Sequence, residues 1–66
     1  TVNASGHPFY IKTADSTGLD NQAIGVTNNG ADVGTIRWIV PEDYSSSTLH
    51  YNCQYHASMH GTFTIN

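Results

Sequence analysis

The sequence predicts an all-β fold, a small antiparallel β-sandwich. Apolar and polar residues alternate over short runs, and clusters of glycine, asparagine, aspartate and serine separate these runs. No segment carries a sustained helical period. At 66 residues the chain has room for a single domain over residues 1–66, and a core of that size is marginal. The single cysteine excludes an internal disulfide, so a metal, an oligomer interface or further chain would have to stabilise it.

The first half of the chain predicts one clear strand and one clear turn. Phe9 to Ile11 form a short apolar run directly after Pro8, and proline is tolerated at the first residue of a strand. Residues 13–22 are polar and predict a loop. A weak strand is expected over 23–27, and Asn28 to Gly30 predict a turn because Asn-Gly tolerates positive φ.

The run from Gly34 to Val40 gives the most regular alternation in the chain. It places Ile36, Trp38 and Val40 on one face, and we therefore expect this segment to be the clearest strand. Trp38 is interpreted as a core aromatic residue. Residues 41–43 are expected to end the strand, and residues 44–47 to form a polar loop.

The last two predicted strands flank the most informative segment. Residues 48–53 alternate, so that Leu49, Tyr51 and Cys53 share one face and the cysteine points inward. The final strand, over residues 61–65, places Phe63 on one face against threonines on the other.

Charge and hydropathy exclude two classes of partner. The formal net charge is −3, and Lys12 and Arg37 are the only strong cations, so a nucleic-acid or anionic-membrane surface is not expected. The most apolar stretch, around residues 36–40, is far too short to span a bilayer. We expect neither nucleic-acid binding nor membrane insertion.

Cys53, His56 and Met59 place a thiolate, an imidazole and a thioether at intervals of three residues on one short loop. In a tight loop these side chains can converge, and the small Ala57 and Ser58 help it to fold closely around an ion. Soft sulfur ligands together with imidazole select copper, whereas a thioether is a poor ligand for zinc, magnesium or calcium. This spacing therefore predicts a copper site.

His7 is the best candidate for a further imidazole, because it precedes a predicted strand at a position from which a side chain reaches a neighbouring loop. His50 is out of phase with Cys53 and should face the other way. His60 adjoins Met59 and is expected to point into solvent. The predicted ligands are thus His7, Cys53, His56 and Met59, with one copper ion per chain.

The segment Tyr51-Asn-Cys53-Gln-Tyr-His56-Ala-Ser-Met59-His-Gly61-Thr-Phe-Thr-Ile65 resembles the ligand loop and final strand of the plastocyanin and amicyanin group of cupredoxins. His7-Pro8-Phe9 is similar to the upstream ligand of that family, and Trp38-Ile-Val-Pro41 to the strand before the cysteine strand. The resemblance implies a Greek-key β-sandwich and a type 1 copper site. It also implies one-electron transfer with a redox partner protein and an extracytoplasmic location in periplasm, thylakoid lumen or exterior.

The sequence departs from the family pattern in two ways. The usual first strands are absent, so the chain is expected to be a fragment or the C-terminal part of a longer chain. Otherwise a second copy or another chain would cover the open N-terminal edge. Pro8 lacks the backbone N–H that commonly donates to the cysteine sulfur. We therefore expect the Tyr55 N–H alone to serve the sulfur, with Tyr51 packed beside the site.

Three other functions stand beside electron transfer. A cupredoxin-fold structural or adhesion module of a larger assembly would keep the fold with or without copper, and a copper storage or delivery protein would use the same ligands. A nucleophilic-cysteine enzyme would need an accessible thiolate, an oriented base and an oxyanion hole. The inward face of Cys53 argues against it, and we expect no enzymatic activity.

Overall fold

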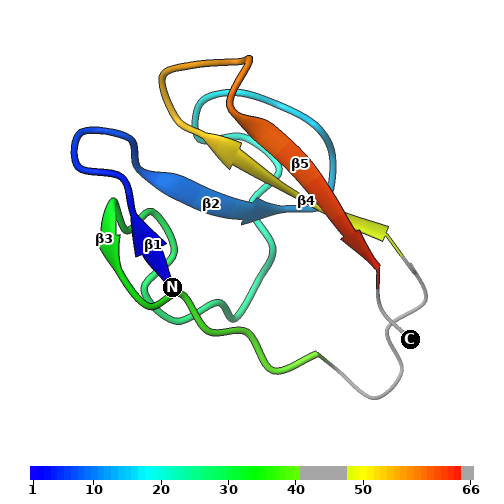
Figure 1. Cartoon of the computed structure of the whole chain (residues 1–66). Helices are drawn as coiled ribbons and strands as arrows, with labels where there is room; N and C mark the ends of the chain where they lie inside the picture. Colours follow the sequence, from blue (N-terminus) through cyan, green and yellow to red (C-terminus); the bar gives the residue numbers. More distant parts are fainter. Residues whose placement is uncertain (41–47, 65–66) are drawn as a thin grey trace.

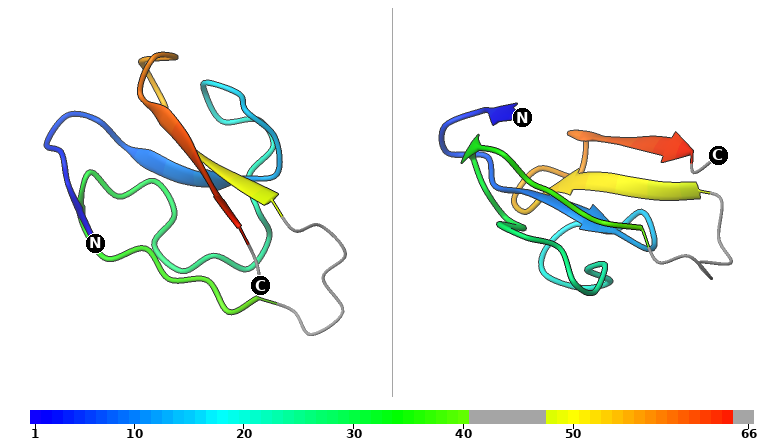
Figure 2. Two further views of the ribbon diagram at one scale, coloured as in Figure 1. Left: turned by 45° about the vertical axis from the view of Figure 1, so that its right-hand side comes forward. Right: turned by 90° about the horizontal axis from the view of Figure 1, so that it is seen from below.

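The computed structural model describes residues 1–40 and 48–64, and this part of the chain is all-β, with no helix (Figure 1). The short strands β1 (Val2–Asn3) and β3 (Val33–Gly34) form one antiparallel sheet. A second antiparallel sheet has the order β2 (Phe9–Lys12), β4 (Thr48–Cys53) and β5 (His60–Thr64), and it can be followed in Figure 2. Two antiparallel sheets agree with the predicted small β-sandwich, while the Greek-key order stays a prediction. The described residues include no helix that is long and apolar enough to cross a membrane.

The three-stranded sheet has one apolar and one polar face, which follow from its register. Cys53 lies opposite Phe9, and Leu49 lies opposite Phe63, so these four side chains share a face. Leu49 and Cys53 are fully buried, as the alternation predicted. His50 lies opposite Lys12 on the other face, away from the cysteine, which confirms that part of the sequence analysis.

The outer edge of β2 is covered by the segment that follows the first loop. Ala23 N–H donates to Ile11 O at 2.9 Å, and the Asn29 side-chain oxygen accepts from Ile11 N–H at 2.8 Å. Gly30 N–H donates to Phe9 O at 2.8 Å. An edge paired in this way offers few free backbone groups to another chain.

The expected strand over Gly34 to Val40 is largely wrong. Only Val33–Gly34 pairs as β3, because β1 offers a partner of two residues, and Arg37 forms an isolated bridge with Thr27. The alternation survives in the burial: Ile36 and Trp38 are half-buried, whereas their neighbours are exposed. The pattern therefore predicted which side chains turn inward, but not whether the backbone finds a partner.

The remaining elements agree better with expectation. The predicted strands at residues 9–11 and 48–53 are confirmed, and the last strand is described as far as Thr64. The turn at residues 28–30 is confirmed, with positive φ at Asn28 (61°) and Gly30 (92°). Residues 23–27 form no strand. The predicted strand end and loop at residues 41–47, and Ile65, lie outside the described residues.

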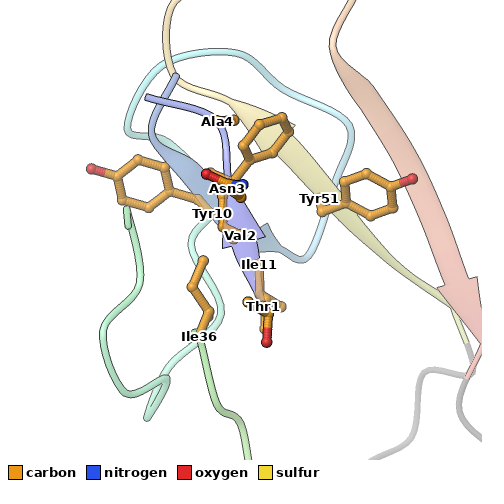
Figure 3. A pocket seen from close by; sticks show the side chains of 9 residues that line it. Thr1, Val2, Asn3, Ala4, Tyr10, Ile11, Ile36 and Tyr51 are labelled. Carbon is orange, nitrogen blue, oxygen red and sulfur yellow. The ribbon is translucent and has the colours of Figure 1, made fainter. Parts of the chain in front are cut away.

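A hollow of about 380 Å³ lies beside the apolar face of the main sheet (Figure 3). Its walls are residues 1–4, which include β1, and residues 9–11 of β2, together with Ile36 and Tyr51. Tyr51 is one of these lining residues, and it is 43% exposed. The side chains of the described residues therefore leave part of the space over this face unfilled.

Candidate metal centre

His7 is held by a tight turn that enters β2. His7 N–H donates to Ala4 O at 2.8 Å, and Gly6 in the turn has φ 83°, a conformation that glycine adopts without strain. Asp32 fixes this turn from outside: its backbone oxygen accepts from Ala4 N–H at 2.7 Å, and its carboxylate accepts from Gly6 N–H at 3.0 Å. This last hydrogen bond lowers the pKa of Asp32 from its usual value, against a smaller opposing effect of burial.

Cys53 is the last residue of β4, and a short loop closes behind it. Cys53 N–H donates to Met59 O at 2.9 Å, and Met59 N–H donates to His56 O at 3.0 Å. These two bonds bend residues 53–59 back on themselves, as the small residues at 57 and 58 permit. The loop therefore brings His56 to the same end of the sheet as the buried thiol.

The three predicted ligands His7, Cys53 and His56 converge. Their two Nδ1 atoms lie 3.1 Å apart, and Cys53 Sγ lies 3.8 Å from the Nδ1 of His7 and 3.7 Å from that of His56. The imidazole rings are tilted by 50° with centroids 4.7 Å apart. Among residues 1–40 and 48–64, this is the group of histidine, cysteine and acidic side chains that could hold a metal ion.

The spacing of these donor atoms fits one bound ion. Typical ligand bonds are about 2.0–2.1 Å for an imidazole nitrogen and about 2.3 Å for a thiolate sulfur. With such bonds, the observed separations of 3.1–3.8 Å correspond to ligand–metal–ligand angles of roughly 100–120°. The arrangement can therefore hold a metal ion in a His2Cys set through the two Nδ1 atoms and the sulfur.

The other predicted site residues are less closely defined. Met59 is half-buried at the end of the loop, and its role as a weak further ligand stays a prediction. The hydrogen bonds within the described chain include none from the Tyr55 N–H to the sulfur, so the predicted donor is not seen. Tyr51 packs its ring on Gly61 and tilts against Phe9 with centroids 6.3 Å apart.

Gln54 connects the two segments that carry the ligands, and sequence reasoning missed it. Its N–H donates to Pro8 O at 2.8 Å, next to His7, and its backbone oxygen accepts from Gly18 N–H at 3.1 Å. Its side-chain oxygen accepts from the Tyr10 hydroxyl at 3.3 Å. These are mostly backbone bonds, which leave no signal in the residue types.

The burial of Lys12 was also missed, because the sequence analysis treated it only as one of the two strong cations. Its side chain is fully buried, and the ammonium donates to the backbone oxygens of Ser16, Gly18 and Asp20 at 3.1, 2.9 and 2.6 Å. Burial lowers the pKa of Lys12 from its usual value, and the Asp20 carboxylate partly offsets this. A buried ammonium needs partners of this kind.

The remaining histidines lie apart from the three ligands. His60 contacts the carboxylate of Asp15 at 3.4 Å, and that carboxylate accepts from Asn52 Nδ2 at 2.7 Å. His50 faces the polar side of the sheet. The structure thus agrees with the sequence in leaving both outside the candidate centre.

Comparisons with protein-family models, curated proteins and solved structures find no match for this chain.

Proposed function

We propose that this chain binds one copper ion in a type 1 site and transfers single electrons. The convergence of two imidazole Nδ1 atoms and one buried thiol sulfur within 3.8 Å carries the proposal. The ligands come from positions 46 and 49 residues apart in sequence, so the pairing of β2 with β4 is what brings them together. The cupredoxin resemblance of the loop and final strand supports the same function.

Met59 favours copper over zinc in this proposal. A His2Cys set with one open position also suits zinc, which takes nitrogen and thiolate ligands. A thioether three residues after His56 adds a soft, weak ligand of the kind found in copper electron-transfer sites. The metal preference therefore depends on Met59 together with Cys53.

Copper in such a site supplies a one-electron couple between its two oxidation states. In this proposal Cys53, His7 and His56 would hold the ion, with the thiolate as the strongest ligand, and Met59 would be a weak further ligand that tunes the site. His56 is exposed whereas His7 is half-buried, so His56 is the ligand nearer to a soluble redox partner. The cupredoxin resemblance supports an extracytoplasmic location as part of this proposal.

An electron carrier suits Cys53 better than a nucleophilic enzyme does. The side chain is 0% exposed, and a nucleophilic thiolate has to reach its substrate. Both neighbouring imidazoles direct Nδ1 toward the sulfur at similar distances, which matches a ligand set more than a single oriented base.

The visible spectrum after addition of one equivalent of copper(II) tests the proposal. We expect an intense copper–thiolate band that is absent in Cys53→Ser and weakened in His7→Ala and His56→Ala. His50→Ala is the matched control, since His50 lies on the opposite face of the sheet. A wild-type chain without the band, or a band that survives Cys53→Ser, would contradict the proposal.

A second candidate is a cupredoxin-fold module of a larger assembly, and the unfilled hollow beside the main sheet favours it. Exposed apolar surface of this kind is typical of contact regions. Sedimentation of the purified chain distinguishes the two: a metal-independent oligomer would support the module, and a monomer with the copper–thiolate band would support the carrier.

A further inference from the structure

We propose that Lys12 is a positioning residue for the metal centre, acting through the loop at residues 16–20 and through Gln54. The inference rests on the proposed function only in treating His7, Cys53 and His56 as metal ligands. The contacts that carry it are those among the protein's own residues.

The loop at residues 16–20 folds around the Lys12 ammonium. Three backbone oxygens converge on Nζ within 2.6–3.1 Å, and the side chain has no exposed surface. Carbonyl oxygens turned toward one point repel each other unless a cation occupies that point. The loop also holds Gly18 at φ 89°, a conformation that suits glycine. The ammonium is therefore the group around which this loop is organised.

Gly18 links the loop at residues 16–20 to the loop that carries Cys53 and His56 through two backbone hydrogen bonds. Its backbone oxygen accepts from Lys12 Nζ, while its N–H donates to Gln54 O at 3.1 Å. Gln54 is the residue directly after Cys53, and its own N–H donates to Pro8 O, directly after His7. The backbone of Gln54 therefore connects the segment that carries His7 with the segment that carries Cys53. Lys12 acts on it through Gly18, which bonds both the ammonium and the Gln54 oxygen.

Loss of the ammonium should therefore loosen the metal centre more than the rest of the fold. Three carbonyl oxygens would lose a charged donor in a buried place, and hydrogen bonds to charged groups are among the strongest in proteins. Residues 16–20 would then move away, and the Gln54 oxygen would lose its Gly18 partner. The bond from Gly18 to Gln54 would then no longer restrain the distances between Cys53 Sγ and the two imidazoles.

Two pairs of variants separate this role from a general loss of stability. Lys12→Met removes the buried cation and keeps the aliphatic stem, and Arg37→Met removes the other strong cation from an exposed side chain. Gly18→Ala strains the backbone of the residue that joins Lys12 to Gln54. Gly25→Ala is the matched control, because Gly25 has φ 83° against 89° for Gly18 and the added methyl meets open space at both positions. Gly18→Ala retains Lys12 and decides the matter if Lys12→Met does not fold.

The first readout is the rate at which iodoacetamide alkylates Cys53 in the metal-free chain, measured with the thermal midpoint. We expect Lys12→Met to react at least about tenfold faster than its control, because losing one charged hydrogen bond changes a local opening equilibrium by that order. Gly18→Ala should also react faster than Gly25→Ala, because it displaces the peptide groups that join Lys12 to Gln54. Equal rates within each pair would overturn the proposal. So would a lower thermal midpoint with an unchanged rate.

The second readout is the copper–thiolate band of the loaded chain. We expect its position and intensity to change in Lys12→Met and Gly18→Ala and to stay at the wild-type values in Arg37→Met and Gly25→Ala. A band that is the same in all five chains would overturn the positioning role. If the wild type itself forms no band, the proposed copper function fails, and the alkylation rates still decide the role of Lys12.

Discussion

The substitution Gly30→Ala tests how the turn at residues 28–30 supports the sheet and the ligand loop. Gly30 has φ 92°, and a methyl group added there would lie 2.6 Å from the Tyr10 hydroxyl oxygen and ring carbon Cζ. The ring therefore has to move. Its hydroxyl donates to the Gln54 side chain at 3.3 Å, and this bond would be lost with the movement.

The expected magnitude follows from these two effects. An alanine at positive φ costs about 1–2 kcal/mol, and a lost neutral hydrogen bond costs about 0.5–1.5 kcal/mol. Together they lower the free energy of unfolding by about 1.5–3.5 kcal/mol. A chain of 66 residues has a total of about 3–10 kcal/mol, so the variant loses a large part of its stability.

Urea unfolding of the metal-free chain, followed by the fluorescence of Trp38, measures this loss. Gly25→Ala is the control, because its φ of 83° carries the same backbone cost while the added methyl meets no neighbouring atom within 4 Å. We expect Gly30→Ala to be the less stable of the two. If the two variants unfold at the same urea concentration, the contact with Tyr10 contributes nothing and the reasoning is refuted.

Three further predictions concern the core, the His7 turn and the metal. Leu49→Ala should cost about 2–5 kcal/mol in urea unfolding because the side chain is fully buried; a loss below about 1 kcal/mol would show that the core collapses around the gap. The lowered pKa of Asp32 means that its contribution to stability is present above its usual pKa of 3.8 and is lost as pH falls below it. Asp32→Asn should therefore show a smaller drop in thermal midpoint between about pH 5 and pH 3 than the wild type, and an equal drop would contradict this. Adding a copper chelator to the loaded wild type should lower its midpoint, since a ligand that binds only the folded state stabilises it, whereas Cys53→Ser should not respond.

The sequence predicted the centre of this structure better than its periphery. Cys53 at the end of an alternating strand was expected to be buried, and it is. Its spacing to His56 determines a local loop, which sequence can reveal. The choice of His7 over His50 followed from strand phase, and the register of β4 confirms that His50 faces away.

The misjudged elements depend on backbone partners that the residue types do not reveal, whether remote in sequence or nearby. Residues 34–40 alternate like a strand, yet their pairing is limited by β1, which has two residues. The burial of Lys12 depends on carbonyl oxygens of a loop whose residue types indicate only polarity. Backbone groups are the same at every position, so their convergence on an ammonium leaves no pattern to read.

The central claim is that His7, Cys53 and His56 share one copper ion. An X-ray absorption spectrum at the copper edge of the chain loaded with one equivalent tests it most directly. We predict one short sulfur shell and two imidazole nitrogens in the wild type, with the sulfur shell lost in Cys53→Ser. A first shell of nitrogen and oxygen alone in the wild type, or a sulfur shell unchanged by Cys53→Ser, would contradict the account.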